Sequence, residues 1–191
     1  AQMSQLLQRS YYQASSHEFL SREADAIFGQ LVMAHGFDTD LMQSGAWQHQ
    51  IAALKELLQS YPSADVLFEF SIPRMGKRAD VVLLVGGIIF VLEYKVGESG
   101  YPRHAIDQAL DYATDLKNFH SGSHDRKIVP ILVSTKARQL PVNDEWFDDG
   151  VSHVQCANDD SLDEVINYFV LNHGSIDLAH CEWIASTYKP T

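Results

Sequence analysis

Hydrophobic positions in the first sixty residues recur at the spacing of an α-helix. One stripe lies in residues 16–35 and ends before Gly36: Leu20, Ala24, Ile27, Phe28, Leu31 and Val32. A second stripe lies in residues 43–60 and ends before Pro62: Trp47, Ile51, Leu54 and Leu58. Because apolar side chains at these spacings share one helix face, the pattern predicts two amphipathic helices, over about 16–35 and 43–60.

The hydrophobic period changes after Pro62. Residues 66–72 alternate, which predicts a strand with Val66, Phe68, Phe70 and Ile72 on one face and Leu67, Glu69 and Ser71 on the other. Residues 79–85 and 88–94 are apolar on both faces and are joined by Gly86-Gly87, a dipeptide suited to a tight hairpin turn. Strands of this kind are expected at the centre of a sheet, with helices covering both sides.

Four further elements follow the hairpin. We expect a helix at about 103–119, a buried strand at 127–135, a short strand near 151–156 and a helix at 162–172. This order of elements predicts an α/β fold in which helices flank a mixed central sheet. The 191 residues contain no internal repeat and are expected to form one domain, with a helical N-terminal part (1–62), a core (63–172) and a C-terminal extension (173–191).

The overall charge counts against a nucleic-acid partner. The chain carries 14 Lys and Arg residues against 25 Asp and Glu residues, a net charge of -11, whereas phosphate binding usually requires a basic surface. The simplest interpretation is a solvated acidic surface that keeps the domain soluble. Residues 74–104 are the exception, with five basic and three acidic side chains, and they contain the predicted hairpin.

Nothing in the sequence indicates a membrane segment. No stretch of about 18 residues is continuously apolar, and the first residues lack the basic and apolar regions of a signal peptide. Cys156 and Cys181 lie 25 positions apart and form no C-x-x-C motif, which is typical of reduced thiols. We therefore expect a cytoplasmic protein.

The predicted hairpin brings two acidic side chains together. With Gly86 and Gly87 as the two turn residues, Asp80 lies opposite Glu93, and cross-strand Cβ atoms are about 4.5 to 5.5 Å apart. A four-residue loop at 73–76 would also set Glu69 opposite Asp80. Buried carboxylates repel each other and need a compensating cation. Lys95 and Arg78 are candidates, and so is a divalent metal, because oxygen ligands suit Mg²⁺. An ordinary ion-pair cluster at the sheet end is the alternative.

The helix after the hairpin carries a third polar feature. Gln108 and Tyr112 are four residues apart and share one helix face. Asp80, twelve intervening residues, Glu93-Tyr94-Lys95 and then Gln108-x-x-x-Tyr112 resemble the PD-(D/E)XK nuclease superfamily, in particular its RecB-like branch. The resemblance covers about residues 16–135 and implies a restriction-endonuclease-like αβββαβ core.

The wider sequence context resembles one kind of bacterial protein. The stretches "FSIPRMGKRADVVLL", "FVLEYKVG" and "HAIDQALDYATDLKNFH" are similar to an N-terminal nuclease-like domain that precedes a superfamily 1 helicase-like ATPase. The ending "WIASTYKPT" is similar to the segment just before that ATPase. The resemblance implies that this chain is the N-terminal piece of a longer protein and that the ATPase domain is a partner.

The resemblance also implies roles for individual residues. Asp80, Glu93 and the backbone carbonyl of Tyr94 would hold one or two Mg²⁺ or Mn²⁺ ions, and Lys95 would orient or help to deprotonate a water molecule. Gln108 would fix that water or the scissile phosphate, with support from Tyr112. The family often supplies a further acid from its first helix, for which Glu23 is the candidate and Glu69 the competitor. The candidates for binding backbone phosphates are Arg74, Lys77, Arg78 and Arg103.

Three functions remain open at this point. The first is a metal-dependent nuclease that acts on DNA together with a helicase-type ATPase. The second is a catalytically silent domain of the same fold that binds nucleic acid or docks a partner domain. The third is a metal-dependent ribonuclease. No G-x-x-x-x-G-K-[ST] motif occurs, so no ATP-binding loop of that type is expected within the chain.

Overall fold

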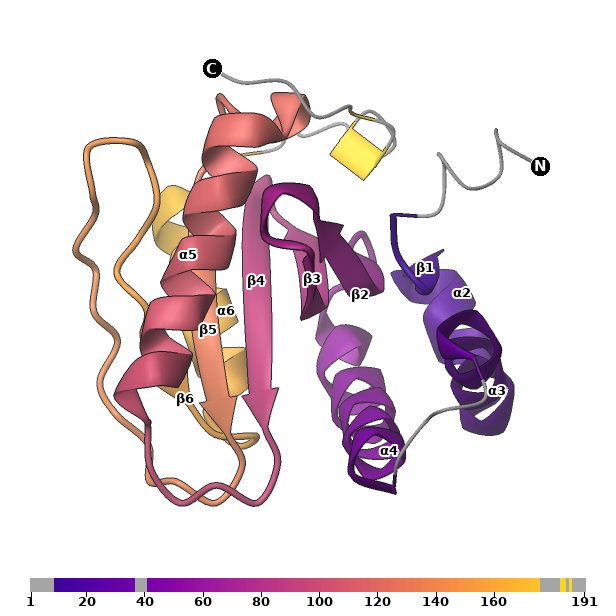
Figure 1. Ribbon diagram of the computed structural model, residues 1–191. Helices are drawn as coiled ribbons and strands as arrows, with labels where there is room; N and C mark the ends of the chain where they lie inside the picture. Colours follow the sequence, from indigo (N-terminus) through magenta and orange to yellow (C-terminus); the bar gives the residue numbers. More distant parts are fainter. Residues whose placement is uncertain (1–8, 37–40, 176–182, 185, 187–191) are drawn as a thin grey trace.

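The computed structural model describes residues 9–36, 41–175, 183–184 and 186. Six strands form one open sheet in the order β1-β2-β3-β4-β5-β6, and helices cover both of its faces (Figure 1). The strands are β1 (Tyr12–Ser15), β2 (Asp65–Ile72), β3 (Lys77–Val85), β4 (Ile88–Lys95), β5 (Ile128–Ser134) and β6 (Gln155–Ala157). Strands β1 to β4 pair antiparallel, while β4, β5 and β6 pair parallel. The predicted α/β fold with a mixed sheet is therefore confirmed.

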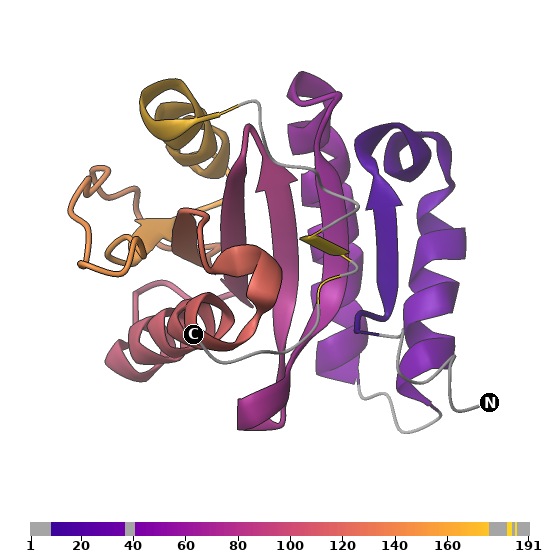
Figure 2. The same ribbon diagram turned by 90° about the horizontal axis from the view of Figure 1, so that it is seen from above.

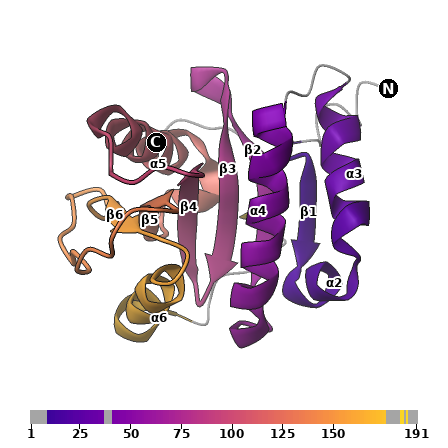
Figure 3. The ribbon, with the colours of Figure 1, turned by 90° about the horizontal axis from the view of Figure 1, so that it is seen from below.

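Two hydrophobic layers enclose the sheet. The helices are α2 (Ser16–Ser21), α3 (Ala24–His35), α4 (Leu41–Leu57), α5 (Arg103–Phe119) and α6 (Leu162–His173), with short 3-10 turns at Leu58–Ser60, Pro73–Met75 and Ser121–Ser123. One layer joins α2, α3, α4 and α6 to the sheet, and the other joins α5 to its opposite face. The views from above and below show α5 and α6 on opposite sides of the sheet (Figures 2 and 3). Both faces of β3 and β4 are consequently buried, as their apolar sequences predict.

The hairpin turn between β3 and β4 has the predicted register. Val85 lies opposite Ile88, and the pairing continues to Val81 opposite Leu92. Gly86 and Gly87 take φ angles of 57° and 81°, in the left-handed region that favours glycine. At Gly87 a Cβ atom would lie 2.4 Å from the carbonyl oxygen of Ser175. This turn fixes which residues of the two strands face each other.

The N-terminal part differs from the prediction in two ways. The helix expected over 16–35 is two helices, α2 and α3, because Arg22 has extended backbone angles (φ -89°, ψ 139°) and Glu23 precedes the first turn of α3. Strand β1 was not predicted. It has four residues of which only Tyr12 is buried, so it carries no alternating pattern, and it forms by pairing with the edge of β2.

The alternation predicted for β2 breaks at Glu69. This residue has a φ of 54°, which is uncommon for a residue with a side chain. Phe68 packs in the layer with α4, but Phe70 and Ile72 pack in the layer with α5. The prediction that Phe68, Phe70 and Ile72 share one face is therefore wrong. The reversed backbone at Glu69 exchanges the faces of the residues on its two sides.

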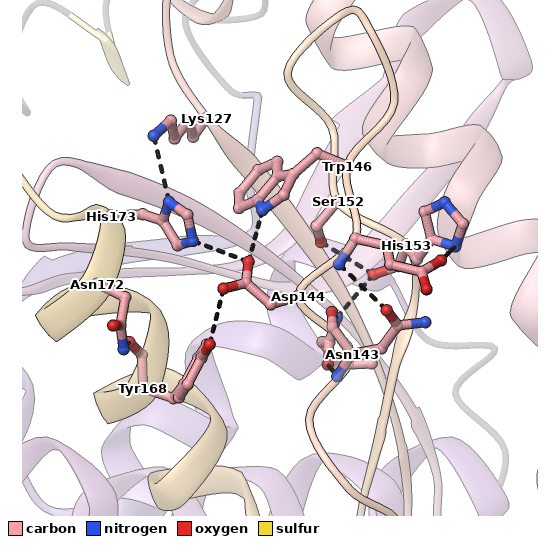
Figure 4. Close-up of polar contacts among 11 residues, drawn as sticks. Lys127, Asn143, Asp144, Trp146, Ser152, His153, Tyr168, Asn172 and His173 are labelled. Atoms are coloured by element: carbon pink, nitrogen blue, oxygen red, sulfur yellow. Dashed lines mark hydrogen bonds and ion pairs between the residues drawn. The ribbon is translucent and has the colours of Figure 1, made fainter.

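A single carboxylate holds the connection between β5 and β6 against α6. Asp144 accepts hydrogen bonds from Tyr168 Oη (2.7 Å), Trp146 Nε1 (2.7 Å) and His173 Nε2 (2.8 Å), as Figure 4 shows. The bond from Tyr168 is the largest of several influences that keep the pKa of Asp144 below its ordinary value. Lys127 Nζ lies 3.3 Å from the other ring nitrogen of His173. These contacts give the long connection a defined position without regular structure.

Two remaining expectations concern the cysteines and the membrane. Cys156 is a free, half-buried thiol whose pKa is raised by burial, and Cys181 lies outside the described residues. Within the described part of the chain, no helix is both long and apolar enough to cross a membrane.

Candidate functional site

A cleft of ≈ 560 Å³ lies where β4 ends, between α4 and α5. Figure 1 shows the carboxyl end of β4 between the first turns of α5 and helix α4. The cleft is lined by seven residues that the sequence singled out: Arg78, Asp80, Glu93, Tyr94, Lys95, Gln108 and Tyr112. They come from β3, β4 and α5. The structure thus brings together all the candidate catalytic residues except the two proposed additional acids.

Asp80 and Glu93 form a reciprocal pair across the hairpin. The Asp80 backbone N–H donates to Glu93 Oε1 (3.2 Å), and the Tyr94 backbone N–H donates to Asp80 Oδ2 (2.8 Å). Each carboxylate is therefore held by the strand that carries the other. Among the described residues, the second oxygen of each carboxylate accepts no hydrogen bond, and neither side chain forms an ion pair. One oxygen of each carboxylate therefore remains available as a metal ligand.

Burial raises the pKa of both acids. The pKa of Asp80 rises to about 7, and that of Glu93 rises well above its ordinary value because of burial and then the neighbouring Asp80 charge. Lys95 opposes both shifts electrostatically, without forming an ion pair with either acid in the described structure. The raised pKa values mean that the pair tends to keep a proton when no cation compensates it, whereas a bound divalent cation would stabilise the ionised form.

This donor set fits a hard divalent cation. Mg²⁺ prefers oxygen ligands and commonly binds through one or two carboxylates, with water completing its shell. No group of three or more His, Cys, Asp or Glu side chains is arranged to hold a metal in the described part of the chain. The residues that could hold the ion are therefore Asp80 and Glu93, with the Tyr94 carbonyl as the predicted third ligand.

The two additional acids do not join this pair. Glu23 is exposed next to the first turn of α3 and does not line the cleft. The pairs on either side of Glu69, Phe68 with Val81 and Phe70 with Ala79, have the predicted register. The Glu69 side chain, however, points to α4, where it accepts hydrogen bonds from Trp47 Nε1 (3.0 Å) and Gln43 Nε2 (3.2 Å). Burial raises the pKa of Glu69, and its charge in turn raises the pKa values of Asp80 and Glu93. Glu69 therefore influences the acidic pair electrostatically, while its hydrogen bonds go to Trp47 and Gln43 of α4.

Helix α5 presents its polar pair to the cleft as predicted. Gln108 Nε2 donates a hydrogen bond to the hydroxyl of Tyr112. Burial raises the pKa of Tyr112 to about 12, so this hydroxyl keeps its proton at neutral pH. The Gln108 side chain is therefore fixed in orientation beside the acids.

The candidate phosphate-binding residues are spread more widely. Arg78 lines the cleft, and its Nη1 donates to the carbonyl oxygens of Glu69 (2.8 Å) and Arg9 (3.2 Å). The other three are exposed outside the cleft lining: Arg74, Lys77 and Arg103. Arg74 lies over the ring of Phe119 (4.1 Å), and Arg103 pairs with Asp107 (3.2 Å). Within the cleft, only Arg78 and Lys95 supply positive charge among the lining residues.

Sequence reasoning missed the wall that α4 contributes. Gln43, Ala46 and Gln50 line the cleft from one face of this helix. Their spacing of three and four residues puts them on one stripe, beside the apolar stripe of Trp47 and Ile51. The stripe was visible in the sequence, but nothing in the pattern indicated that α4 packs beside the hairpin acids.

Comparisons with known proteins place the chain in no family. No protein-family model matches it, and no curated protein matches it. Among solved structures it is similar to the crystal structure of protein VC1899 from Vibrio cholerae, with 15% sequence identity and a TM-score of 0.35. The match covers 89% of this chain and 48% of that chain, so this chain spans about half the length of that protein. A likeness at this level carries no argument about function.

Proposed function

We propose that this chain is a metal-dependent nuclease domain that hydrolyses phosphodiester bonds in DNA. The observation that carries the proposal is the meeting of Asp80 and Glu93 in one cleft with Lys95 and the Gln108–Tyr112 pair. These residues also carry the resemblance to the PD-(D/E)XK superfamily, and the order of elements from α4 to β5 agrees with its core. On the same resemblance, a helicase-type ATPase segment is the proposed partner.

The residues divide the chemistry among them. Asp80, Glu93 and the Tyr94 carbonyl would hold Mg²⁺ or Mn²⁺, which polarises a phosphodiester and stabilises the leaving oxygen when bound. Lys95 orients the attacking water and offsets the negative charge that develops on the phosphate. Gln108, fixed by its bond to Tyr112, orients the water or the scissile phosphate. Arg78 contributes positive charge at the wall of the cleft.

A second candidate function is a silent module of the same fold. Two observations favour it: the net charge of -11, and the orientation of Glu69 away from the pair, toward α4. Such a domain would bind nucleic acid or dock the partner ATPase without cleaving. Metal binding separates the two functions, because only the nuclease requires it.

The test compares the wild-type chain with Asp80→Asn. We expect the wild type to bind Mg²⁺ or Mn²⁺ in calorimetry and to cleave DNA, and Asp80→Asn to bind the metal about tenfold more weakly or worse, since it loses one of two carboxylate ligands. Single-stranded DNA, double-stranded DNA and RNA serve as substrates, so that a ribonuclease is recognised by cleavage of RNA alone.

Glu23→Gln is the matched control. This acid is exposed and lies outside the cleft lining, so the variant should keep metal binding and cleavage. Nucleic-acid binding by a wild-type chain that binds no metal would support the silent module. Metal-dependent cleavage that survives in Asp80→Asn would remove the proposed nuclease mechanism.

A further inference from the structure

Four positively charged side chains form no hydrogen bond, ion pair or ring contact within the described part of the chain: Lys77, Lys95, Lys136 and Arg138. Lys77 is already a candidate for phosphate binding. Lys95 ends β4, while Lys136 and Arg138 are exposed and follow the end of β5. Because β4 and β5 are parallel, these three cations lie at the same edge of the sheet, in a chain with a net charge of -11.

Hydrogen bonds join the loops that follow β4 and β5 into one structure beside the cleft. The Thr135 backbone N–H donates to the Lys95 carbonyl oxygen (3.2 Å), and the Lys136 N–H donates to the Glu98 carbonyl oxygen (2.9 Å). The Gly97 N–H donates to Thr135 Oγ1 (2.7 Å). We call residues 95–98 and 135–138 the cleft rim, because Lys95 and Glu98 also line the cleft. Figure 1 shows both loops at the bottom of the sheet. Lys136 is thus one hydrogen bond away from the cleft lining.

The cleft rim has an excess of positive charge. It contains three cations and one acid, Glu98. Tyr101 Oη donates to the Arg138 carbonyl oxygen (2.8 Å), which fixes the end of the rim beside the start of α5. Arg103, in the first turn of α5, is paired with Asp107 (3.2 Å) and adds no net charge there. The positive charge of this edge therefore comes from the rim itself.

A separate acidic hollow adjoins the cleft rim. Its volume is ≈ 360 Å³, and its lining between α4 and the start of α6 includes four acids: Glu56, Asp159, Asp160 and Asp163. It shares no lining residue with the cleft. Asn158 Nδ2 donates to the Ala137 carbonyl oxygen (3.0 Å), which sets this hollow next to the rim. A polyanion at the rim is repelled by the hollow and is thereby directed to the side of the cleft.

The chemistry of the cleft rim suits a chain of phosphates. Lysine and arginine without protein partners bind phosphate oxygens and read no base sequence. A nucleic-acid strand in a duplex carries one phosphate per about 3.4 Å of helix axis. A strand with one phosphate in the cleft therefore has further phosphates at the rim, whereas a single small anion would leave most of these cations unused. The carboxyl ends of parallel strands are also a common position for ligands in α/β proteins.

We infer that Lys136 and Arg138 hold the backbone phosphates of a nucleic-acid strand where it leaves the cleft across the rim. The inference rests on the proposed nuclease function for the position of the scissile phosphate at Asp80 and Glu93. The two cations bind the strand independently of its sequence and take no part in the chemical step.

The test measures binding of labelled single-stranded and double-stranded DNA by fluorescence anisotropy over a series of salt concentrations, with a chelator present so that no strand is cleaved. The variants are Lys136→Gln, Arg138→Gln and the double variant. Each single variant should bind about five- to eightfold more weakly at about 0.1 M salt, because one counterion fewer is released. The slope of log K against log salt should fall in magnitude by about 0.7 on single strands and about 0.9 on duplexes. The double variant should lose about 25- to 60-fold.

Lys127→Gln is the matched control. This exposed lysine precedes β5 at the opposite end of the strand, and the variant makes the same change in net charge. It should alter the affinity by less than about twofold, because salt screens charges beyond about 10 Å.

Several outcomes overturn the inference: no binding of DNA by the wild type, unchanged affinity and salt slope in the double variant, or an equal loss in Lys127→Gln, which would mean that only net charge matters. Polyglutamate that binds as tightly as DNA and is lost in the same variants would assign the rim to an acidic polypeptide. A chain that binds no metal but binds DNA through these two cations keeps the rim and loses the nuclease. A chain that cleaves DNA with metal and is insensitive to both substitutions keeps the nuclease and loses the rim.

Discussion

At the scale of single residues, the sequence predicted that Asp80 and Glu93 lie together. It did not predict the orientation of the neighbouring Glu69 side chain. A two-glycine turn fixes the register of a hairpin, so Asp80 and Glu93 could be paired from their distance to Gly86 and Gly87 alone. The register of the pairs on either side of Glu69 was also predicted correctly. The Glu69 side chain nevertheless turns to Trp47 and Gln43, because its backbone adopts a positive φ that no sequence pattern indicates.

Glu93→Gln should stabilise the metal-free domain while it abolishes the metal-dependent cleavage that we propose. Glutamine keeps an oxygen that accepts the bond from the Asp80 N–H and removes a buried acid that repels Asp80. We expect the free energy of unfolding to rise by about 1 kcal/mol, measured by urea denaturation at neutral pH with a chelator present. Glu98→Gln is the control, because Glu98 also lines the cleft but is only half-buried. It should change the free energy of unfolding by less than about 0.5 kcal/mol. A loss of stability in Glu93→Gln would show that the acid pair is a structural contact.

At the scale of elements, long periodic segments were predictable and short or irregular ones were not. Helix α5 (Arg103–Phe119) has the predicted bounds, because its apolar stripe spans several turns. Strand β1 and the break between α2 and α3 were missed, since four residues carry too little periodicity and a break of two residues leaves the stripe intact. Elements that form only by pairing with another part of the chain leave a weak local signal.

The hairpin turn offers a test of how much one glycine contributes to the stability of the fold. Gly87→Ala should lower the free energy of unfolding by about 2 kcal/mol or more, because alanine is strained at a φ of 81° and its Cβ would lie 2.4 Å from the Ser175 carbonyl oxygen. Gly97→Ala is matched, with a φ of 85° and no atom within 4 Å of the added Cβ, and should cost about 1 kcal/mol. Equal losses in chemical denaturation would mean that the Ser175 contact relaxes freely.

At the scale of the whole molecule, the cleft depends on packing that the sequence does not record. Its lining comes from α4, from the β3–β4 hairpin, from the loop that follows β4 and from α5. Helices α4 and α5 lie on opposite faces of one sheet, each packed in its own hydrophobic layer. The residues of the hairpin and α5 were predictable from local spacing and from a family resemblance. The α4 wall was not, because amphipathic periodicity tells which face of a helix is buried but not which neighbour it meets.

A buried histidine joins distant parts of the fold and should make stability depend on pH. His120 is fully buried, its ring centroid 4.5 Å from that of Trp183 and 6.0 Å from that of Phe70, and its Nδ1 lies 2.9 Å from Ser123 Oγ. Burial is the main cause that lowers its pKa from 6.5 to about 3. Between these values the unfolded chain binds a proton that the folded chain does not, so stability falls as the pH decreases below 6.5.

His120→Gln should remove this contribution, since glutamine can replace the bond to Ser123 and does not titrate. We expect the free energy of unfolding of the wild type to lose up to about 1.4 kcal/mol more per pH unit than that of the variant in this range, measured by urea denaturation at a series of pH values. His17→Gln, at an exposed position of α2, should leave the wild-type slope unchanged. Parallel pH profiles for the wild type and His120→Gln would mean that the imidazole gains its proton without leaving the fold, and that its contacts with Trp183 and Phe70 tolerate a charge.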